Sequence, residues 1–323
     1  MSDFEWFKDL AKKCRDEVAK RVIGQTQVID GILTCLICDG HVLLEGVPGL
    51  AKTLVVKTFA DISGLEFKRI QFTPDLLPAD VSGTLIYDQN VGAFSVRKGP
   101  VFSNIVLADE INRAPAKVQS ALLEAMAEKQ VTIGEKTYAL PEPFFVLATQ
   151  NPIEQEGTYT LPEAQLDRFL LKILVDYPSA KEEAAIVTTA GLAALTAVDK
   201  VLAAKDFKRI CAMLGSVKVD EKIVSYIVSL VGVTRPETIK RSSSIDFLRY
   251  ISCGASPRGG IALYNCAKVQ AMFAGRDYVI PEDVKAAAPS VLRHRLLLSY
   301  EAAADGISAD DLIAKILALM PVP

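Results

Sequence analysis

Histidine is almost missing from this chain, and the other things it lacks exclude further classes of function. Only His41 and His294 occur, which argues against a metal site or a nucleophilic centre based on histidine side chains. The formal net charge is −3 without a long cationic run, which argues against a binder of duplex nucleic acid. No apolar run approaches the length of a membrane span, and the N-terminus does not resemble a signal peptide. We therefore expect a cytoplasmic protein.

Cysteine is also sparse, and its spacing has no metal-binding pattern. Of the six cysteines, only Cys35 and Cys38 are close together, and their segment is apolar, which favours buried thiols over a redox pair. With 323 residues, of which 50% are hydrophobic and 23% charged, the chain has the composition of a soluble globular protein and the length for two domains.

A glycine-rich loop is the most informative stretch. Residues 46–53 read Gly-Val-Pro-Gly-Leu-Ala-Lys-Thr, between an apolar run at 41–44 and a helical segment at 54–60. A phosphate-binding loop needs this strand, loop and helix context, because backbone N–H groups and the helix N-terminus then face the anion. Lys52 is expected to reach the β- and γ-phosphates, and the Thr53 hydroxyl to ligate magnesium. Nucleotide contacts are predicted for Val47, Pro48, Gly49, Leu50, Ala51, Lys52, Thr53 and Leu54.

Ala51 stands where the general pattern has a glycine before the lysine. Alanine is small and tolerates right-handed helical angles, so the loop is expected to close if Ala51 already belongs to the first helical turn. The alternative is a Gly/Pro turn followed by an ordinary helix with one exposed lysine.

Two carboxylates follow a second buried strand. The run 104–108 ends in Asp109 and Glu110, and parallel sheets bind ligands at the carboxyl ends of their strands. Asp109 is expected to hold magnesium through water, and Glu110 to polarise the attacking water. Taken alone, the pair also fits a solvated acidic turn. Asn151, after the buried strand 144–149, fits either a turn former or a group that holds the water against the γ-phosphate.

The order of elements predicts an α/β nucleotide-binding domain at 1–178, followed by a smaller all-α domain at 179–323. After an amphipathic helix at 4–20, apolar strands alternate with helical patterns, which is typical of a parallel sheet. Polar and apolar residues alternate in 84–97 and in 131–138, which predicts two β-hairpin insertions. From Ser179 onward the pattern is helical throughout.

Two arginines have both a structural and a functional interpretation. Arg168 follows a short helix that begins at Pro162, and it is first of all a salt-bridge partner for Asp167 or Glu163. Arg258 follows Ser256 and Pro257, a good N-cap and first helical residue. The functional interpretations direct each guanidinium at a γ-phosphate.

Five motifs in this order resemble those of MoxR-type AAA+ ATPases. They are the loop at 46–53, Leu-Ala-Asp-Glu-Ile-Asn-Arg-Ala at 107–114, Ala-Thr-Gln-Asn-Pro at 148–152, Leu-Pro-Glu-Ala-Gln-Leu-Asp-Arg-Phe at 161–169 and Ser-Pro-Arg at 256–258. The resemblance spans nearly the whole chain and implies a P-loop AAA+ core with hairpin insertions and a helical lid. Alanine at position 51 is common in that family.

The resemblance also implies a role for each matched residue. Lys52 and Thr53 belong to Walker A, Asp109 and Glu110 to Walker B, and Asn151 to sensor 1. Arg168 is similar to the arginine finger, which acts on the nucleotide of the neighbouring subunit, and Arg258 to the sensor-2 arginine. The residues that match the adenine pocket, in place of a simple helix cap, are Val22, Ile23, Gly24 and Gln25. Arg113 lies near the expected subunit boundary, and its role stays open.

By resemblance, the protein is expected to bind ATP and Mg²⁺, to form a homo-oligomeric ring of about six subunits and to remodel or mature partner proteins. Clients of that family include metal-cofactor enzymes, often beside proteins with von Willebrand factor A domains. One alternative is a nucleotide-dependent scaffold with little hydrolysis, against which the complete Asp109-Glu110 pair argues. Another is a nucleic-acid motor, against which the acidic and amide-rich tip of the first hairpin argues.

Overall fold

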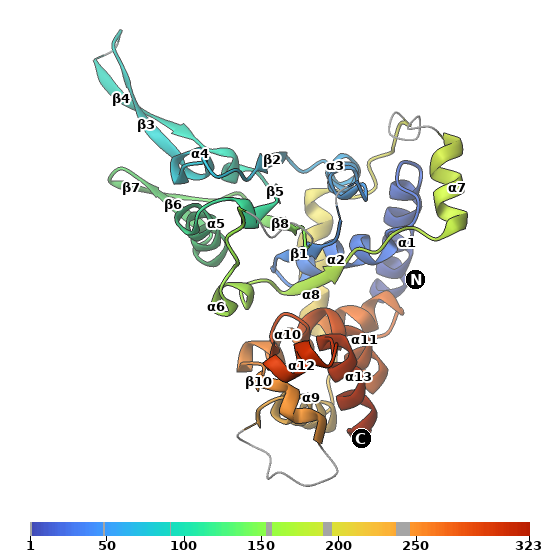
Figure 1. Ribbon diagram of the computed structural model, residues 1–323. Helices are drawn as coiled ribbons and strands as arrows, with labels where there is room; N and C mark the ends of the chain where they lie inside the picture. Colours follow the sequence, from blue (N-terminus) through green and yellow to red (C-terminus); the bar gives the residue numbers. More distant parts are fainter. Residues whose placement is uncertain (1, 48, 91, 153–156, 190–195, 237–245) are drawn as a thin grey trace. The chain divides into compact units, whose positions relative to one another are not determined.

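The computed structural model describes residues 2–47, 49–90, 92–152, 157–189, 196–236 and 246–323 (Figure 1). It divides into two compact units. The α/β unit contains Leu10–Phe169 and Ile173–Lys208, and the helical unit contains Met1–Asp9, Leu170–Lys172 and Arg209–Pro323. In the described ranges, no helix combines the length and the apolarity that crossing a membrane requires.

A five-stranded sheet organises the α/β unit. Its strands are β1 (Val42–Glu45), β2 (Phe67–Gln71), β5 (Ile105–Asp109), β8 (Phe145–Gln150) and β9 (Leu171–Leu174), in the order β2-β5-β8-β1-β9. The pairs β2–β5, β5–β8 and β1–β8 are parallel, which confirms the predicted sheet. The apolar residues of β1, β5 and β8 are buried, because helices cover a parallel sheet on both faces. The register places Gln71 beside Asp109 and Leu44 beside Thr149, so the polar strand ends meet at one edge.

Helices surround this sheet as its alternating sequence predicts. α2 (Thr26–Ile37) contacts β1 and β8, α3 (Lys52–Ser63) contacts β5, and α5 (Ala116–Glu128) covers a core cluster that includes Phe72, Val106 and Phe169. The remaining helices of this part are short or peripheral: α4 (Pro78–Ser82), η1 (Pro100–Phe102), η2 (Ile111–Arg113), α6 (Glu163–Leu166) and α7 (Ala180–Thr189).

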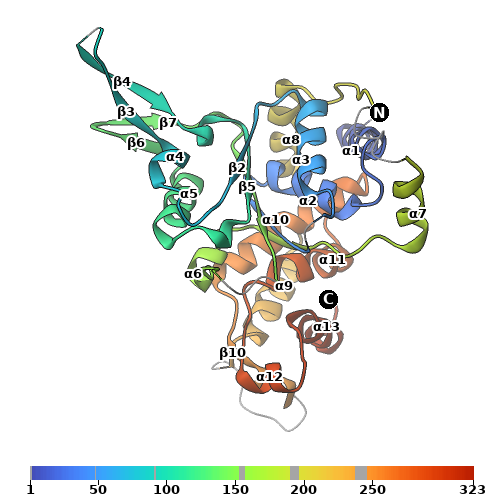
Figure 2. The same ribbon diagram turned by 45° about the horizontal axis from the view of Figure 1, so that its top comes forward.

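Both predicted hairpins are present, and they lie side by side in the two views (Figures 1 and 2). The first is β3 (Gly83–Asp88) with β4 (Ala93–Lys98), and the second is β6 (Gln130–Ile133) with β7 (Lys136–Ala139). A Cβ on Gly134 would come 2.6 Å from Leu85 Cδ1, so the turn of the second hairpin supports the first. At the base, Lys98 Nζ lies 4.9 Å from the Phe102 ring and 5.7 Å from the Tyr138 ring.

The helical unit is formed mainly by α9 (Glu221–Val233), α10 (Pro257–Phe273), α11 (Pro281–Leu292), α12 (Tyr300–Ala304) and α13 (Ala309–Leu319). α8 (Ala204–Ser216) and α1 (Asp3–Ala19) each contribute one end to it. The prediction of helix throughout is wrong in one respect, because β10 (Ile251–Cys253), after η5 (Asp246–Tyr250), pairs with β11 (Leu297–Leu298) in an antiparallel ribbon. These strands are too short for periodicity to distinguish them from loops.

Contacts far apart in sequence explain why the helical unit is discontinuous. Phe7 stacks on Phe273 with ring centroids 5.5 Å apart, which ties the N-terminal residues to α10. Arg295 and Arg293 donate hydrogen bonds to the carbonyls of Leu170 and Lys172, at 3.1 and 2.9 Å. α7 falls in the α/β unit. The domain boundary expected between residues 178 and 179 therefore stays a prediction.

Candidate functional site

The polar edge of the sheet opens into a cavity of about 480 Å³. The loop after β1 and the ends of β2, β5 and β8 form its wall. The wall consists of Gly49, Leu50, Ala51, Lys52, Thr53, Leu54, Arg69, Gln71, Asp109, Glu110, Thr149, Gln150 and Asn151. The structure thus brings the predicted loop together with both predicted carboxylates and Asn151. Pro48 lies outside the described residues, and Val47, which is half-buried, does not belong to the wall.

The loop reaches α3 through backbone angles that differ from our expectation. Ala51 does not belong to the first helical turn: it is the N-cap of α3, and its φ of +54° lies in the left-handed region. That conformation costs a residue with a Cβ about 1–2 kcal/mol, and such strain is concentrated at functional sites. The turn brings the chain into α3 with the first N–H groups of the helix at the cavity.

Gly46 and Lys52 hold the loop against the sheet. A Cβ on Gly46 would come 2.6 Å from the carbonyl oxygen of Val175, so only glycine fits there. The Lys52 ammonium donates a hydrogen bond to the carbonyl of Gly46 across the loop. Partial burial lowers the pKa of Lys52, and the nearby charges of Asp109 and Glu110 oppose that shift. An anion bound in the cavity would stabilise the charged form of the partly buried Lys52.

Asp109 ends β5, and both of its carboxylate oxygens accept hydrogen bonds. Oδ1 accepts from the hydroxyl of Thr149 at 2.6 Å. Oδ2 accepts from Arg69 on the neighbouring strand β2, through Nε at 3.1 Å and Nη2 at 2.7 Å. The carboxylate is therefore fixed in orientation by one strand on each side of β5.

Glu110 follows in a left-handed conformation, with φ of +56°. Its N–H donates to the Thr149 hydroxyl at 2.8 Å, so this one hydroxyl joins the two acidic residues. Its Oε2 accepts from Gln71 Nε2 at 2.8 Å and lies 3.4 Å from Arg113 Nε. These contacts fix the Glu110 carboxylate at the edge of the cavity. The left-handed backbone conformation of Glu110 has no signal in the sequence.

The turn after Glu110 is fixed by a buried glutamine of α5. Gln119 is fully buried, and its amide nitrogen donates to the carbonyls of Ala114 at 3.0 Å and Ile111 at 3.3 Å. α5 therefore supports the segment that carries the second carboxylate. Asn151, beyond the end of β8, is 7% exposed and contributes to the cavity wall.

Sequence reasoning missed four residues of this wall, Arg69, Gln71, Thr149 and Gln150. The alternation of Arg69 and Gln71 with the buried Ile70 and Phe72 indicates that β2 has one polar face. That signal alone does not say which strand lies beside β2, and the register does.

Arg168 and Arg258 lie outside the cavity wall. Arg168 is exposed after α6, and its Nη1 donates to the carbonyl of Leu123 in α5 at 2.6 Å. Arg258 is in the first turn of α10 in the helical unit, where its N–H donates to the Ser256 hydroxyl at 3.2 Å. The predicted helix start at Ser256 is confirmed.

The segment predicted to line the adenine pocket forms the entry to α2. Gly24 and Gln25 have φ of +75° and +61°, and Val22 is buried. A Cβ on Gly24 would come 2.8 Å from the Glu182 carboxylate of α7, so α7 packs closely there. None of the four residues, Val22, Ile23, Gly24 and Gln25, belongs to the cavity wall described above.

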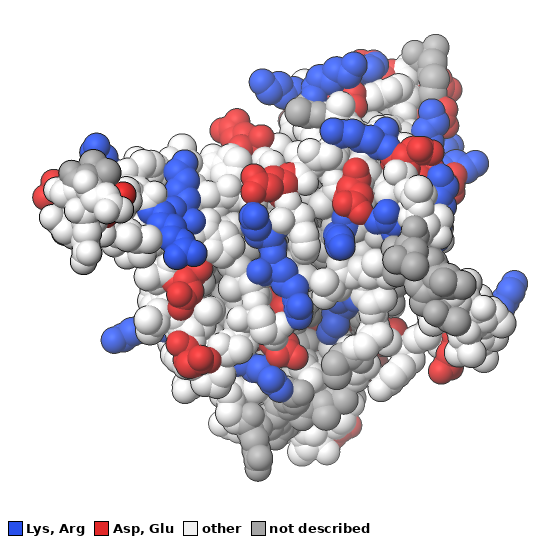
Figure 3. All heavy atoms as spheres, turned by 90° about the horizontal axis from the view of Figure 1, so that it is seen from above, with Lys and Arg blue, Asp and Glu red and all other residues white. Residues whose placement is uncertain are grey.

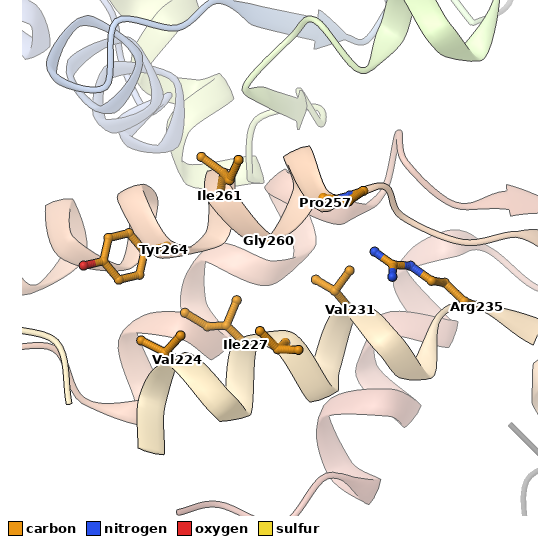
Figure 4. Close-up of a pocket in the computed structure, with 9 residues that line it drawn as sticks. Val224, Ile227, Val231, Arg235, Pro257, Gly260, Ile261 and Tyr264 are labelled. Carbon is orange, nitrogen blue, oxygen red and sulfur yellow. The ribbon is translucent and has the colours of Figure 1, made fainter. Parts of the chain in front are cut away.

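A second cavity, of about 400 Å³, lies between α9 and α10 in the helical unit (Figure 4). Its wall is apolar except for Arg235 at one end and the hydroxyl of Tyr264, and it is formed by residues such as Ile227, Val231 and Ile261. None of the predicted site residues lines it.

The residues of the first cavity fit a magnesium nucleotide. The Thr53 hydroxyl and the Asp109 carboxylate are hard oxygen donors of the kind that Mg²⁺ prefers. α3 is 12 residues long and presents its N-terminus to the cavity, where phosphate groups bind. In the part of the chain that the structure describes, no three His, Cys, Asp or Glu side chains form a metal cluster.

Comparison with known proteins gives matches over both units. Residues 41–171 match the family model of the "ATPase family associated with various cellular activities (AAA)", and residues 249–316 match that of the AAA lid domain. The chain is 49% identical over 308 residues to the chaperone MoxR1 of Mycobacterium tuberculosis, with 95% of this chain and 81% of that protein covered.

Two further relatives extend over almost the full chain. The MoxR protein of Methylorubrum extorquens is 32% identical over 338 residues, which cover 99% of this chain and 96% of the relative. A crystal structure of a candidate ATPase from Cytophaga hutchinsonii superposes with a TM-score of 0.91 at 48% identity, and covers 99% of this chain and 97% of its own.

Proposed function

This chain belongs to the MoxR-type family of AAA+ ATPases, and from that membership we propose that it binds and hydrolyses ATP in a ring and remodels partner proteins. The observation that carries the proposal is the cavity at the carboxyl edge of the sheet, where Lys52, Asp109 and Glu110 converge. The cytoplasm, where ATP is plentiful, is the proposed location.

We assign binding of the triphosphate to the loop and the start of α3. The N–H groups of Gly49 to Thr53 would surround the phosphates, and the Lys52 ammonium would leave the Gly46 carbonyl for the β- and γ-oxygens. Thr53 and Asp109 would hold Mg²⁺, which, when bound, neutralises phosphate charge. Adenine contacts are proposed for the entry to α2, Val22 to Gln25.

We assign the hydrolytic step to groups at the ends of β5 and β8. Glu110 would accept a proton from the attacking water and orient it in line with the γ-phosphate. Asn151 would hold that water from the other side through its amide. The Gln71 and Arg113 contacts keep the Glu110 carboxylate at the cavity edge until substrate binds.

We propose that catalysis is completed between subunits of a homo-oligomeric ring, most simply a hexamer. Arg168 is exposed and hydrogen-bonded to α5 rather than placed in the wall of its own cavity, which suits an arginine finger directed at a neighbour. Arg258 of the helical unit is proposed as the sensor-2 residue on the phosphates.

The test of the proposal is ATP turnover as a function of protein concentration. We expect phosphate release per subunit to rise with concentration, because a lone subunit lacks the finger, and Lys52→Ala to abolish nucleotide binding. Full turnover by a strict monomer, or failure of the purified protein to bind magnesium nucleotide, would overturn the proposal.

The finger itself is tested by Arg168→Ala in the assembled ring. Loss of a finger costs on the order of 10³-fold in turnover. Lys117→Ala is a matched control, because Lys117 is an exposed cation on α5, the helix that Arg168 contacts. Equal turnover in the Arg168 variant and the parent would refute the assignment.

The two hairpins are the proposed contact with client proteins. Tyr87 and Phe94 are 53% and 69% exposed on the first hairpin, which suits recognition of apolar polypeptide. A pull-down with Glu110→Gln, expected to trap ATP-bound rings on their clients, would identify them. Metal-cofactor enzymes and proteins with von Willebrand factor A domains are the classes proposed as partners.

Two other functions give different results in the same assays. A nucleotide-dependent scaffold would bind ATP with almost no phosphate release, whereas the intact pair of carboxylates favours hydrolysis. A nucleic-acid motor would show DNA-stimulated turnover. On the face drawn in Figure 3, basic and acidic side chains alternate and neither sign forms a continuous field, which disfavours nucleic acid as a partner.

A further inference from the structure

Arg69 places a positive charge directly on the carboxylate proposed to hold the metal. Two nitrogens of its guanidinium contact the same oxygen, Asp109 Oδ2, at 2.7 and 3.1 Å, and Nη2 also donates to Gln71 Oε1 at 2.5 Å. The other carboxylate oxygen is engaged by Thr149. Oδ2 therefore faces β2, and Arg69 occupies that side of the carboxylate.

We propose that Arg69 is a built-in counter-cation that competes with Mg²⁺ for Asp109 and must leave Oδ2 when the metal nucleotide binds. This inference rests on the proposed function, since it concerns the metal of the same cavity. Arg69 is thus a positioning residue that sets how strongly nucleotide binding depends on magnesium.

Electrostatics gives the direction of the effect. A divalent ion held by the Asp109 carboxylate, directly or through water, comes within a few ångströms of the guanidinium, and like charges at that distance repel. Each cation attracts the Asp109 carboxylate, but the two cations repel one another. Binding of the metal and pairing with Arg69 are therefore negatively coupled, and removal of Arg69 should tighten metal binding.

The surroundings of Arg69 allow it to leave. Its side chain is 48% exposed, whereas that of Asp109 is 16% exposed, so the arginine can return to solvent and the carboxylate remains in the wall. β2 is the edge strand of the sheet, and no further strand covers this guanidinium in the described sheet. An exposed ion pair is also weak enough for a divalent ion to displace.

The test measures the affinity of a fluorescent ATP analogue with and without magnesium. The quantity is the ratio of the affinity in saturating Mg²⁺ to the affinity in EDTA. For Arg69→Gln we expect this ratio to rise by at least about fivefold, the lower end of typical couplings between two ligands. Arg69→Lys keeps the charge and loses the fork, so its ratio should lie between parent and Arg69→Gln.

Two controls separate this effect from general charge and from folding. Lys68→Gln removes one positive charge from the same strand, but Lys68 alternates to the other face, 3.8 Å from Glu66, and its ratio should equal that of the parent. In an Asp109→Asn background, Arg69→Gln should no longer change the ratio, because Arg69 acts through that carboxylate.

The outcomes are distinguishable. An unchanged or lower ratio in Arg69→Gln, or the same rise in the Asp109→Asn background, would overturn the inference and make Arg69 a direct phosphate ligand or a bystander. If the parent itself binds no nucleotide in either condition, the proposed function fails first. If Arg69→Gln does not fold, the comparison of the affinity ratios of Arg69→Lys and the parent decides whether the inference holds. Equal ratios would contradict competition by the two guanidinium nitrogens that contact Asp109.

Discussion

The two ends of the central sheet use polar residues for opposite purposes. At the carboxyl end, Asp109 and Glu110 face an open cavity. At the amino end, His41 precedes β1 and is 4% exposed; its Nδ1 accepts from the N–H of Val146 at 3.1 Å, and its Nε2 lies 3.2 Å from the carbonyl of Met126. Burial lowers the pKa of His41 to about 4, so the ring stays neutral. A closed polar site stabilises the fold, and an open one is free for chemistry.

The sharpest test of this contrast is Glu110→Gln. The amide keeps the shape of the side chain but cannot accept a proton from water, and loss of a general base lowers turnover by roughly 10²–10⁴-fold. Nucleotide affinity and the denaturation midpoint should stay near those of the parent. Phosphate release, nucleotide binding and urea unfolding measure the three quantities. A large loss of stability would show that this edge of the sheet also supports the fold.

The amino end should show the reverse pattern on acidification. Because the folded-state pKa of His41 is about 4 and its reference value is 6.5, the unfolded state takes up the proton first as the pH falls. The stabilisation is complete above pH 6.5 and is lost as the pH falls toward 4, by about 3 kcal/mol. Urea unfolding between pH 7.5 and 4.5 measures it. His41→Asn should be less stable at pH 7.5 but lose less on acidification; equal pH profiles would contradict this.

Sequence alone predicted the parts of the fold that have strong local signals. Buried runs such as 105–108 mark parallel strands, and the alternation around Gly134 marks a hairpin, because both depend on neighbours in sequence. The loop, Asp109 and Glu110 were predicted in the same way, and the structure brings them to one cavity, whereas their roles stay predictions. β10 and β11 were missed, since two or three residues carry no periodicity.

The features that the sequence did not predict depend on residues that are close in space but far apart in the chain. The left-handed Ala51 reflects how the loop must turn into α3, which its own preference does not reveal. The sequence shows Arg69 only as a polar residue of a strand. Its position beside Asp109 follows from the pairing of β2 with β5. The scarcity of histidine argued against a catalytic role for His41. Its role as a buried link between β8 and the end of α5 comes from tertiary contacts.

Thr149 lies at the carboxyl end of the sheet but is buried. It therefore tests whether polar residues at that end also stabilise the fold. Its hydroxyl is buried at the carboxyl end, donates to Asp109 and accepts from the N–H of Glu110. Thr149→Val should cost about 2 kcal/mol of stability, because a hydrogen bond to a charged group is lost. Turnover should fall as well, since both carboxylates lose their common partner. Thr149→Ser, which keeps the hydroxyl, is the control in urea unfolding and phosphate release; a neutral Thr149→Val would place Thr149 among residues without a role.

Phe94 of the first hairpin should show the smallest effect on folding, because its side chain is exposed and is not among the residues of the buried core cluster. Phe94 is 69% exposed, and Phe94→Ser should change the free energy of unfolding by less than about 0.5 kcal/mol. Phe72, which is fully buried, is the matched comparison, and Phe72→Ser should cost at least about 3 kcal/mol. Urea unfolding gives both values. If client capture also depends on Phe94, its exposure serves recognition; a large loss of stability in Phe94→Ser would instead mean that the hairpin packs on another surface.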